Sequence, residues 1–314
     1  MKKNKKIIAI QGDPIKSLNL KTDTTILLAL EAQRRGYRIY YYETKNMTFS
    51  ENNIYALCNE VKFYEDRKNF FVIKKLKKID LSKTKFILMR QNPPFNMDYI
   101  TATFLLQRIT KKTKIINDPF SVRNLPEKLC SINFLNLMPP TIFTNNFDEI
   151  KKFQKKYKKI VIKPTHGYGG KNIIFVNKKL IKNEISFYLS KHKNVMVQKF
   201  IPKIIEGDKR VFIIGGIIKG AIRRIPKKGS IVSNIGQGGK AVLTTLNKKE
   251  FIIANEVARM LKKNKIILAG IDLISNYLSG DINITSPTGL KNFKDLSGIN
   301  LAIDFWNHLE KSKD

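Results

Sequence analysis

The most informative part of the sequence is Ile160-Val161-Ile162-Lys163-Pro164-Thr165-His166-Gly167-Tyr168-Gly169-Gly170. It reads as a short apolar strand that ends in a lysine and is followed by a loop with three glycines. Such a loop can turn backbone N–H groups toward an anion, while the lysine adds a point charge. It is not a Walker A motif, because Asn172 follows Gly170-Lys171 where that motif has Ser or Thr. Ordinary turns also collect glycine, so residues further along the chain must decide its meaning.

Those residues lie in the C-terminal third, where Asp272, Asp281 and Asn283 fall in segments predicted to be paired strands. Carboxylate and amide oxygens are the ligands that Mg²⁺ takes when it shares its shell with phosphate groups. The two acids could be ordinary turn residues, but packing alone seldom places two acids and an asparagine on paired strands. A phosphate loop together with a magnesium set predicts ATP chemistry.

The composition excludes several classes of protein. The 314 residues are 42% hydrophobic, and the formal net charge is +34. The lysines are scattered over the whole chain, in pairs such as Lys74-Lys75, Lys151-Lys152 and Lys262-Lys263, so they do not form the clustered footprint of a nucleic-acid-binding face. No apolar run approaches the roughly 18 residues of a membrane span. We therefore expect neither a nucleic-acid partner nor a membrane partner, although an anionic substrate would be attracted to such a surface.

The two cysteines, Cys58 and Cys130, lie far apart and match no metal or redox spacing. The basic N-terminus is followed by the apolar run 7–10, which is too short for a signal-peptide core. A reducing cytoplasm is the expected location.

Residues 1–122 alternate between predicted strands and helices, a pattern that favours a parallel sheet and an N-terminal α/β lobe. Asp23 is the expected N-cap of the first helix, which Gly36 would end. The strands are expected at 6–10, 37–43, 86–89 and 114–117, and the helices at 23–35 and 99–110.

Residues 123–314 have a different pattern, in which hairpins are accompanied by helices, and this predicts two α+β lobes, at about 123–200 and 201–314. The predicted helices are 128–137 and 251–261. The predicted strands are 160–162, 173–176, 196–201, 210–214, 217–225, 269–274 and 281–285. The polar, glycine-bearing loop 229–239 lies within the segment 226–240 and could be a plain surface loop.

The order of these segments resembles that of the ATP-grasp ligases. The segments that carry the resemblance are Glu127-Lys128-Leu129, Ile162-Lys163-Pro164 with its glycine loop, Gln198 to Pro202, Glu206 to Arg210, Arg224-Ile225-Pro226, Gly270-Ile271-Asp272 and Asp281 to Thr288. Three N-terminal segments are similar to bacterial-type glutathione synthetases, namely Asp13-Pro14-Ile15, Leu30 to Tyr37 and Leu88 to Phe95. The resemblance covers nearly the whole chain. It implies an N-terminal parallel α/β lobe, the pre-ATP-grasp lobe, followed by the two α+β lobes of an ATP-grasp fold.

The resemblance implies that ATP phosphorylates the C-terminal carboxylate of γ-glutamylcysteine and that the amine of glycine then attacks the acyl phosphate. Mg²⁺, or Mn²⁺ in its place, is the implied metal, and the family tends to form homo-oligomers. The residues implied for ATP are Lys128, Lys163, Gly167, Gly169, Gly170, Gln198, Lys199, Phe200, Ile201 and Asp208. The others implied are Asp272, Asp281 and Asn283 for metal, Arg210 and Arg224 for catalysis, and Arg90, Ser286 and Thr288 for substrate.

The chain departs from the family pattern at several positions. Asp281 stands where the family usually has Glu, and Leu290-Lys291-Asn292 stands where it tends to have Ile-Arg-Glu. The resemblance implies that the segment 226–240, with the loop 229–239, is a mobile lid over the reacting groups. Val232 and Lys240 occupy lid positions where arginines are expected, and lysine does not replace a bidentate arginine. These changes leave open a degenerate, inactive ligase.

Two further alternatives are another ATP-grasp carboxylate–amine ligase and a basic nucleic-acid-binding protein without enzymatic activity. The segments Arg34-Arg35-Gly36 and Arg90 to Phe95 argue against the first alternative. The dispersal of the lysines argues against the second.

Overall fold

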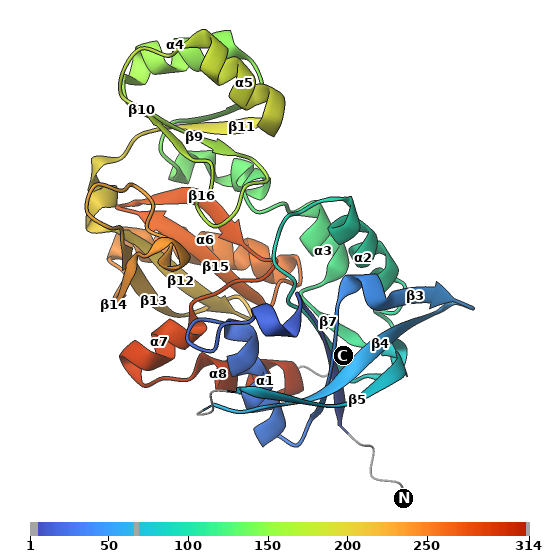
Figure 1. Ribbon diagram of the computed structural model, residues 1–314. Helices are drawn as coiled ribbons and strands as arrows, with labels where there is room; N and C mark the ends of the chain where they lie inside the picture. The colour runs from blue at the N-terminus through green and yellow to red at the C-terminus, as the bar shows by residue number, and fades with distance from the viewer. Residues whose placement is uncertain (1–5, 66–68, 312–314) are drawn as a thin grey trace, which may run out of the picture.

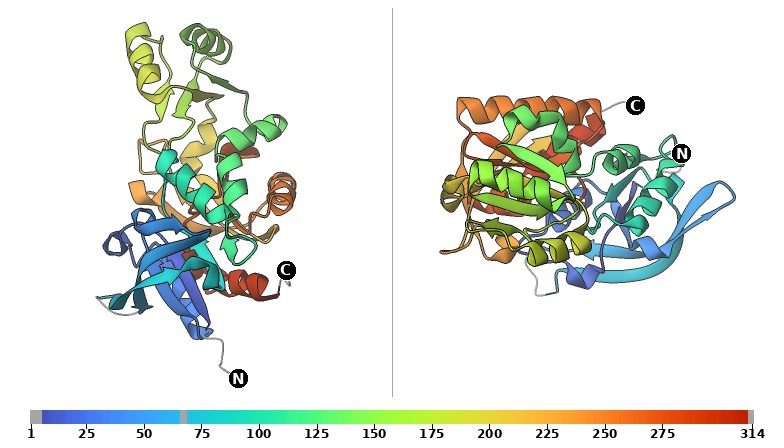
Figure 2. Two further views of the ribbon diagram at one scale, coloured as in Figure 1. Left: turned by 90° about the vertical axis from the view of Figure 1, so that its right-hand side faces the viewer. Right: turned by 90° about the horizontal axis from the view of Figure 1, so that it is seen from above.

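The computed structural model describes residues 6–65 and 69–311, which form three β-sheets with helices packed around them (Figure 1). The sheets follow one another along the chain, and the left view of Figure 2 shows an elongated molecule with the four-stranded sheet at one end. In the part of the chain that is described, no helix is both long enough and apolar enough to span a bilayer.

The N-terminal sheet has seven strands, of which β2, β1, β6 and β7 lie next to one another and are all parallel. This confirms the predicted parallel α/β lobe. Asp23 caps the first helix through the backbone N–H of Thr25 (2.6 Å), as expected. The elements are β1 (Ile7–Gln11), α1 (Thr24–Arg34), β2 (Arg38–Tyr42), β3 (Met47–Ser50), β4 (Asn53–Phe63), β5 (Phe71–Asp80), β6 (Phe86–Met89), α2 (Met97–Gln107), β7 (Lys114–Ile116) and α3 (Pro119–Asn124).

The strands β3, β4 and β5 extend this sheet with antiparallel pairs that the sequence analysis did not predict. β5 is an edge strand with most of its side chains exposed, including Leu76 at 57%. Because neither face of β5 is buried, its sequence lacks the alternation that marks a half-buried strand.

The middle of the chain begins with η4 (Leu129–Leu137), a 3₁₀ segment with a kink at Phe134, where φ is −130°. The prediction of a regular helix over 128–137 was therefore wrong in its geometry. A four-stranded antiparallel sheet in the order β10-β9-β11-β8 follows it. Its elements are β8 (Thr141–Thr144), α4 (Phe147–Tyr157), β9 (Ile160–Pro164), β10 (Ile174–Val176), α5 (Lys182–His192) and β11 (Val195–Lys199).

The last sheet has five antiparallel strands in the order β14-β13-β12-β15-β16. Its elements are β12 (Asp208–Ile214), β13 (Ile217–Ile225), β14 (Lys240–Thr244), α6 (Lys248–Lys263), β15 (Leu268–Ile274) and β16 (Tyr277–Asn283), followed by α7 (Leu290–Ser297) and α8 (Leu301–Lys311). Short 3₁₀ turns, η5 (Pro202–Glu206) and η6 (Ile235–Gln237), precede β12 and β14.

The C-terminal helix α8 returns to the N-terminal lobe and lies beside α1 (Figure 1). Trp306 is fully buried there, and its indole N–H donates to the carbonyl of Leu28 (2.9 Å). A second junction is formed by Asn117 at the end of β7. Its amide donates to the carbonyls of Leu268 (2.8 Å) and Ile284 (2.6 Å) and accepts from the N–H groups of Ile267 and Leu268. The first and last sheets are thus joined by buried contacts.

Candidate active site

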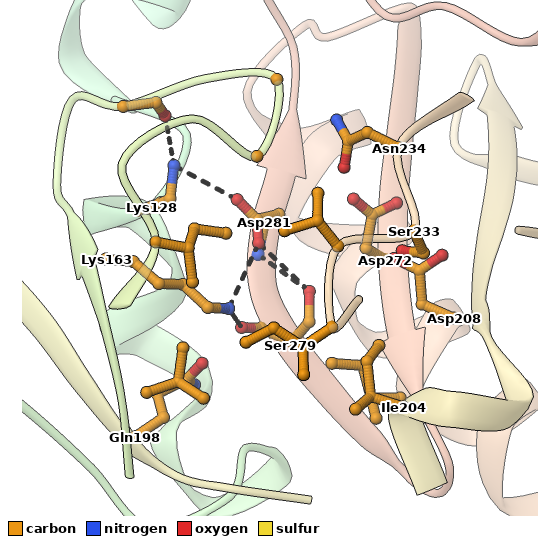
Figure 3. Close-up of a pocket in the computed structure, with 18 of the residues that line it drawn as sticks. Lys128, Lys163, Gln198, Ile204, Asp208, Ser233, Asn234, Asp272, Ser279 and Asp281 are labelled. Atoms are coloured by element: carbon orange, nitrogen blue, oxygen red, sulfur yellow. Dashed lines mark hydrogen bonds and ion pairs between the residues drawn. The ribbon is translucent and has the colours of Figure 1, made fainter. Parts of the chain in front are cut away.

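A cleft lies between the four-stranded and five-stranded sheets (Figure 3). The structure brings into its lining every residue predicted for ATP, metal and catalysis. Lys128, Lys163 and Gln198 lie on one side, Asp208 and Asp272 on the other, and Asp281 between them. Residues separated by up to about half of the chain therefore line one cleft.

The phosphate side is built on the end of β9. β9 pairs with β10 as a hairpin whose connection is the glycine loop, as predicted. Lys163, the penultimate residue of β9, is buried, and its Nζ donates to the carbonyl of Ser279 (3.2 Å). Burial lowers the pKa of Lys163, although Asp281 opposes this effect. Lys128 reaches the same place from the start of η4, where it donates to the carbonyl of Gly167.

Asp281 lies between the two lysines. One carboxylate oxygen is 3.3 Å from Nζ of Lys128, and the other is 3.6 Å from Nζ of Lys163. Burial alone would raise the pKa of Asp281, but Lys128 and Lys163 outweigh it and hold this pKa well below its usual range. A pair of ammonium groups that holds one anion is also arranged to hold the oxygens of a phosphate.

Two acids and two arginines form the opposite wall, and the strand register sets their pairing. Arg210 on β12 lies opposite Asp272 on β15, and its guanidinium makes two contacts with that carboxylate, at 2.5 and 2.9 Å. Arg224 on β13 lies opposite Asp208 and binds it at 2.8 and 2.5 Å. Arg224 also lies 2.9 Å from Asp272.

These pairs explain the charge state of the wall. Although burial opposes it, the two arginines hold the pKa of Asp272 below its ordinary value. The carboxylates Asp272 and Asp281 are therefore ionised at neutral pH, as metal ligands must be.

The metal-binding prediction fits the chemistry of the donors. Asp272 on β15 and Asp281 and Asn283 on β16 line the same part of the cleft. The amide nitrogen of Asn283 donates to the carbonyl of Gly270 (3.0 Å), which fixes the orientation of the amide. Within residues 6–65 and 69–311 no group of three or more His, Cys, Asp and Glu side chains could hold a metal. Two carboxylates and an amide suit a Mg²⁺ ion that completes its shell with phosphate and water.

The far end of the cleft is apolar and suits a flat ring. Phe200, after β11, packs on Phe175 with ring centroids 4.3 Å apart. Gln198 is held by a hydrogen bond to the hydroxyl of Thr141 (3.0 Å). Lys199 and Ile201 also line the cleft, as does Ile204, which the sequence analysis did not identify.

The predicted lid lies against the glycine loop. Gln237 donates to the carbonyl of Gly169 (3.0 Å), and Val232 packs on Gly170, where a Cβ atom would lie 2.4 Å from the valine methyl group. Most of the lid is exposed or half-exposed, but Ser233 is only 4% exposed. Ser233 and Asn234 line the cleft and had not been predicted to do so.

A second, polar pocket of about 540 Å³ adjoins the cleft and shares Arg210, Arg224 and Asn283 with it. Ser286 and Thr288, two of the predicted substrate residues, line this pocket, as do Asp23 and Asn92 from the N-terminal lobe. Asp23 had been identified only as a helix cap.

Arg90, the third predicted substrate residue, lies outside the lining of both pockets and is only 5% exposed. It donates to the hydroxyl of Thr25 (3.1 Å) and to the carbonyl of Pro287 (3.0 Å). Arg90 thus holds Pro287, a residue of the polar-pocket lining, in place. Direct binding of a carboxylate by Arg90 stays a prediction.

Glu127 is a residue near the site for which the sequence suggested no role. It is partly buried, and one of its carboxylate oxygens accepts from the backbone N–H groups of Ile284 and Thr285 and from the Thr285 hydroxyl. Its position beside Lys128 in the sequence was the only available signal.

Comparisons with known proteins agree with this geometry. Residues 7–123 match the family model of the prokaryotic glutathione synthetase N-terminal domain, and residues 127–298 match that of the prokaryotic glutathione synthetase ATP-grasp domain. The chain is 34% identical to the glutathione synthetase of Rhodopseudomonas palustris over 98% of both chains. It is 36% identical to that of Buchnera aphidicola subsp. Baizongia pistaciae, over 97% of this chain and 96% of the relative.

Solved structures support the fold at lower identity. D-cycloserine synthetase DcsG superposes with a TM-score of 0.66 at 14% identity, covering 96% of this chain and 99% of that one. The ATP-grasp ligase PsnB, solved with a minimal precursor, Mg and ADP, superposes with a TM-score of 0.62 at 14% identity. The match covers 98% of this chain and 97% of that one. The predicted fold class, an α/β N-terminal domain followed by an ATP-grasp domain, is thereby confirmed. The chain belongs to the prokaryotic glutathione synthetase family.

Proposed function

We propose that this protein is an ATP-dependent ligase that joins γ-glutamylcysteine to glycine, giving glutathione, ADP and phosphate. The observation that carries the proposal is the junction of two pockets at Arg210 and Arg224. One pocket has the lysines, the glycine loop and the oxygen donors that a nucleotide with its metal requires. The other is polar and lies against the N-terminal lobe, so a carboxylate bound there would meet the terminal phosphate at the two arginines.

The cleft residues suit phosphoryl transfer from ATP to a carboxylate. Lys128 and Lys163 would bind the phosphates, with Asp281 moving from the lysines to the metal. Asp272, Asp281 and Asn283 would hold Mg²⁺, or Mn²⁺ in its place, and the metal supplies charge neutralisation between the phosphates.

At the opposite wall, Arg210 and Arg224 would stabilise the transferring phosphoryl group and then the acyl phosphate. Removal of one such charged contact typically slows a reaction by about 10²-fold or more. The amine of glycine then attacks the acyl carbon, phosphate leaves, and the amine loses a proton.

The polar pocket has a feature suited to a γ-glutamyl group. Such a group carries a free α-ammonium beside its α-carboxylate, so its pocket needs an acidic side chain away from the reacting end. Asp23 lines the pocket from the N-terminal lobe, and only one of its oxygens is engaged by the helix cap. Nearby, Asn92 is fixed by its side-chain hydrogen bond to Asp13 (2.7 Å). We assign Asp23 to the ammonium group, and Ser286 and Thr288 to the peptide.

The location, oligomeric state and partners of the protein are inferred from the family resemblance and are part of the same proposal. We expect a cytoplasmic homo-oligomer that acts on these small substrates and binds neither nucleic acid nor membrane. Light scattering at micromolar protein concentration measures the oligomeric state, and a monomeric mass would contradict this part.

The substrate assignment is tested by product analysis. Purified protein with Mg-ATP is given glycine, alanine or glutamate together with γ-glutamylcysteine or the α-linked dipeptide, and products are identified by mass spectrometry. We expect glutathione as the main product and no product from the α-linked dipeptide. A product with glutamate but none with glycine would assign the chain to another carboxylate–amine ligation. ATP binding without any product would identify an inactive relative.

A further inference from the structure

A third cavity lies away from the active site, at the junction between the N-terminal sheet and the five-stranded sheet. Its volume is about 620 Å³, which is within the range of small-molecule sites. It shares no lining residue with the nucleotide cleft or with the adjoining polar pocket. The mechanism proposed above makes no use of it.

The lining is strongly basic. Lys111 and Lys114 reach it from the segment around β7, Lys262 and Lys265 from the end of α6, and His308 from α8. The one acidic residue of the lining is Asp118, and its side chain already accepts from the N–H of Ser121 (2.9 Å) at the start of α3.

The lysines of this cavity differ from those of the active site in their partners. In the active site Lys128 and Lys163 both contact the carboxylate of Asp281. In contrast, Lys111, Lys262 and Lys265 form no ion pair with any residue in 6–65 or 69–311. The charge of these three ammonium groups is therefore not neutralised by the described side chains.

The imidazole of His308, in the wall of this cavity, lies in the positive potential of a partly different set of lysines. Burial lowers the pKa of His308, and Lys114, Lys262 and Lys219 lower it further. Lys219 itself is paired with Asp304 (2.7 Å). The positive potential thus comes from several elements rather than from one helix face.

The two walls of the cavity are held in a fixed relation. Asn117 lies three residues from Lys114 and binds Ile267 and Leu268, which follow Lys265. The cavity also lies at one end of β12 and β15, where Ile214 pairs with Leu268, while the same strands place Arg210 opposite Asp272 in the active site. A ligand here would bridge two lobes at the far end of the catalytic strands.

We propose that this cavity binds a compact anion with two or more phosphate groups. Lysine ammonium groups bind phosphate oxygens as point charges, and cations on two facing walls suit a ligand with charge at both ends. The proposal concerns a site separate from the ligase site, and it is tested by binding rather than by turnover.

The test is calorimetric titration with inorganic pyrophosphate at about 150 mM salt, where charges more than about 8 Å apart on the surface are largely screened. The wild-type protein is expected to show two classes of site. The Lys163→Ala variant should lose pyrophosphate binding in the nucleotide cleft and keep binding in the basic cavity. The double variant Lys262→Gln/Lys265→Gln should keep the cleft site and weaken the second class at least tenfold, while ligase activity stays near that of the wild type.

A matched control removes the same charge from another helix end. Lys155 and Lys156 are exposed in the last turn of α4, as Lys262 is in the last turn of α6. Lys155→Gln/Lys156→Gln should leave both classes unchanged. The proposal is overturned if the wild type binds pyrophosphate at the cleft alone, or if both double variants weaken binding equally, since the net charge would then be the cause.

Discussion

The carboxylate of Asp281 lies 3.6 Å from the ammonium of Lys163 and 3.3 Å from that of Lys128, in the part of the cleft where phosphates are expected. An acidic side chain of the protein thus pairs with both of the buried cations that are expected to bind the phosphates. The same acid belongs to the proposed metal set. Nucleotide with its metal can therefore replace the lysine contacts with phosphate oxygens and give Asp281 a cation, without leaving a buried charge unpaired.

The two residues of this pair are expected to be essential for turnover. Lys163→Ala and Asp281→Ala should each reduce the rate of ADP formation by about 10²-fold or more, since each removes a charged contact to the reacting phosphates or the metal. Steady-state assays in saturating Mg²⁺ measure the rate, and circular dichroism checks that the fold is intact. Lys159→Ala, an exposed lysine next to β9, is the control and should keep full activity. Near-normal turnover by either cleft variant would refute the assignment.

The low pKa of Asp281 predicts a dependence of stability on pH. A carboxyl whose pKa is lower in the folded state than in the unfolded state stabilises the fold above its unfolded pKa, and this contribution is lost as the pH falls. The unfolding free energy of wild type should therefore exceed that of Asp281→Asn by a constant amount above about pH 5, and the difference should shrink toward about pH 2. Urea unfolding at several pH values measures it. A difference that stays the same at acid pH would contradict the ion pairs.

The lid should control coupling rather than nucleotide binding. Closed over the cleft, residues 229–239 exclude water from the acyl phosphate. Replacement of 230–237 by a short glycine linker should leave ADP binding unchanged, lower glutathione formation, and raise the ADP released per glutathione above one. The two products are counted in the same reaction. If the shortened protein forms one peptide bond per ATP at the wild-type rate, the segment has no such role.

Asp23 is expected to affect the affinity for the peptide more than the rate of the chemistry. Asparagine also caps helices well, so Asp23→Asn should keep the stability of α1 while removing the charge. We expect KM for γ-glutamylcysteine to rise about tenfold, in line with the net 1.5 kcal/mol or so of a charged hydrogen bond, with kcat changed little. For an analogue that lacks the α-amino group, wild type and variant should have the same KM. A tenfold gap that persists with this analogue would assign Asp23 a structural role alone.

Asn117 should be important for joining the two lobes. Its side chain makes four hydrogen bonds to backbone groups of Ile267, Leu268 and Ile284, and Asn117→Ala leaves these groups without a partner. Loss of about 3 kcal/mol or more of unfolding free energy is expected. Asn124→Ala is the control, because its side chain makes one exposed hydrogen bond to Phe120 and should cost under about 1 kcal/mol. Equal losses for the two variants would show that the Asn117 contacts do not hold the lobes together.

Much of the fold could be predicted where the hydrophobic pattern is strong. Buried strands such as β1 and β6 are short apolar runs, and α1 has both a capping acid and a terminal glycine. Elements with little buried surface gave no such signal. In α4 only Ile150 and Phe153 are buried among lysines, and it was not predicted.

The residues that line the cleft could be named in advance because their segments follow the order that resembles the ATP-grasp ligases. Which arginine pairs with which acid could not be predicted. Arg210 meets Asp272 and Arg224 meets Asp208 only through the register of β12 with both its neighbours, which one sequence does not reveal. The role of Ser279 was also hidden, because it acts on Lys163 through its backbone carbonyl.

The central claim is that ATP activates the carboxylate of γ-glutamylcysteine by phosphorylation where the nucleotide cleft meets the polar pocket. The most direct measurement uses γ-glutamylcysteine labelled with ¹⁸O in its C-terminal carboxylate, together with Mg-ATP and glycine. An acyl phosphate transfers one labelled oxygen to phosphate when the amine displaces it. We predict that each phosphate released with glutathione carries one ¹⁸O from the peptide. Unlabelled phosphate accompanying glutathione would contradict the proposed mechanism.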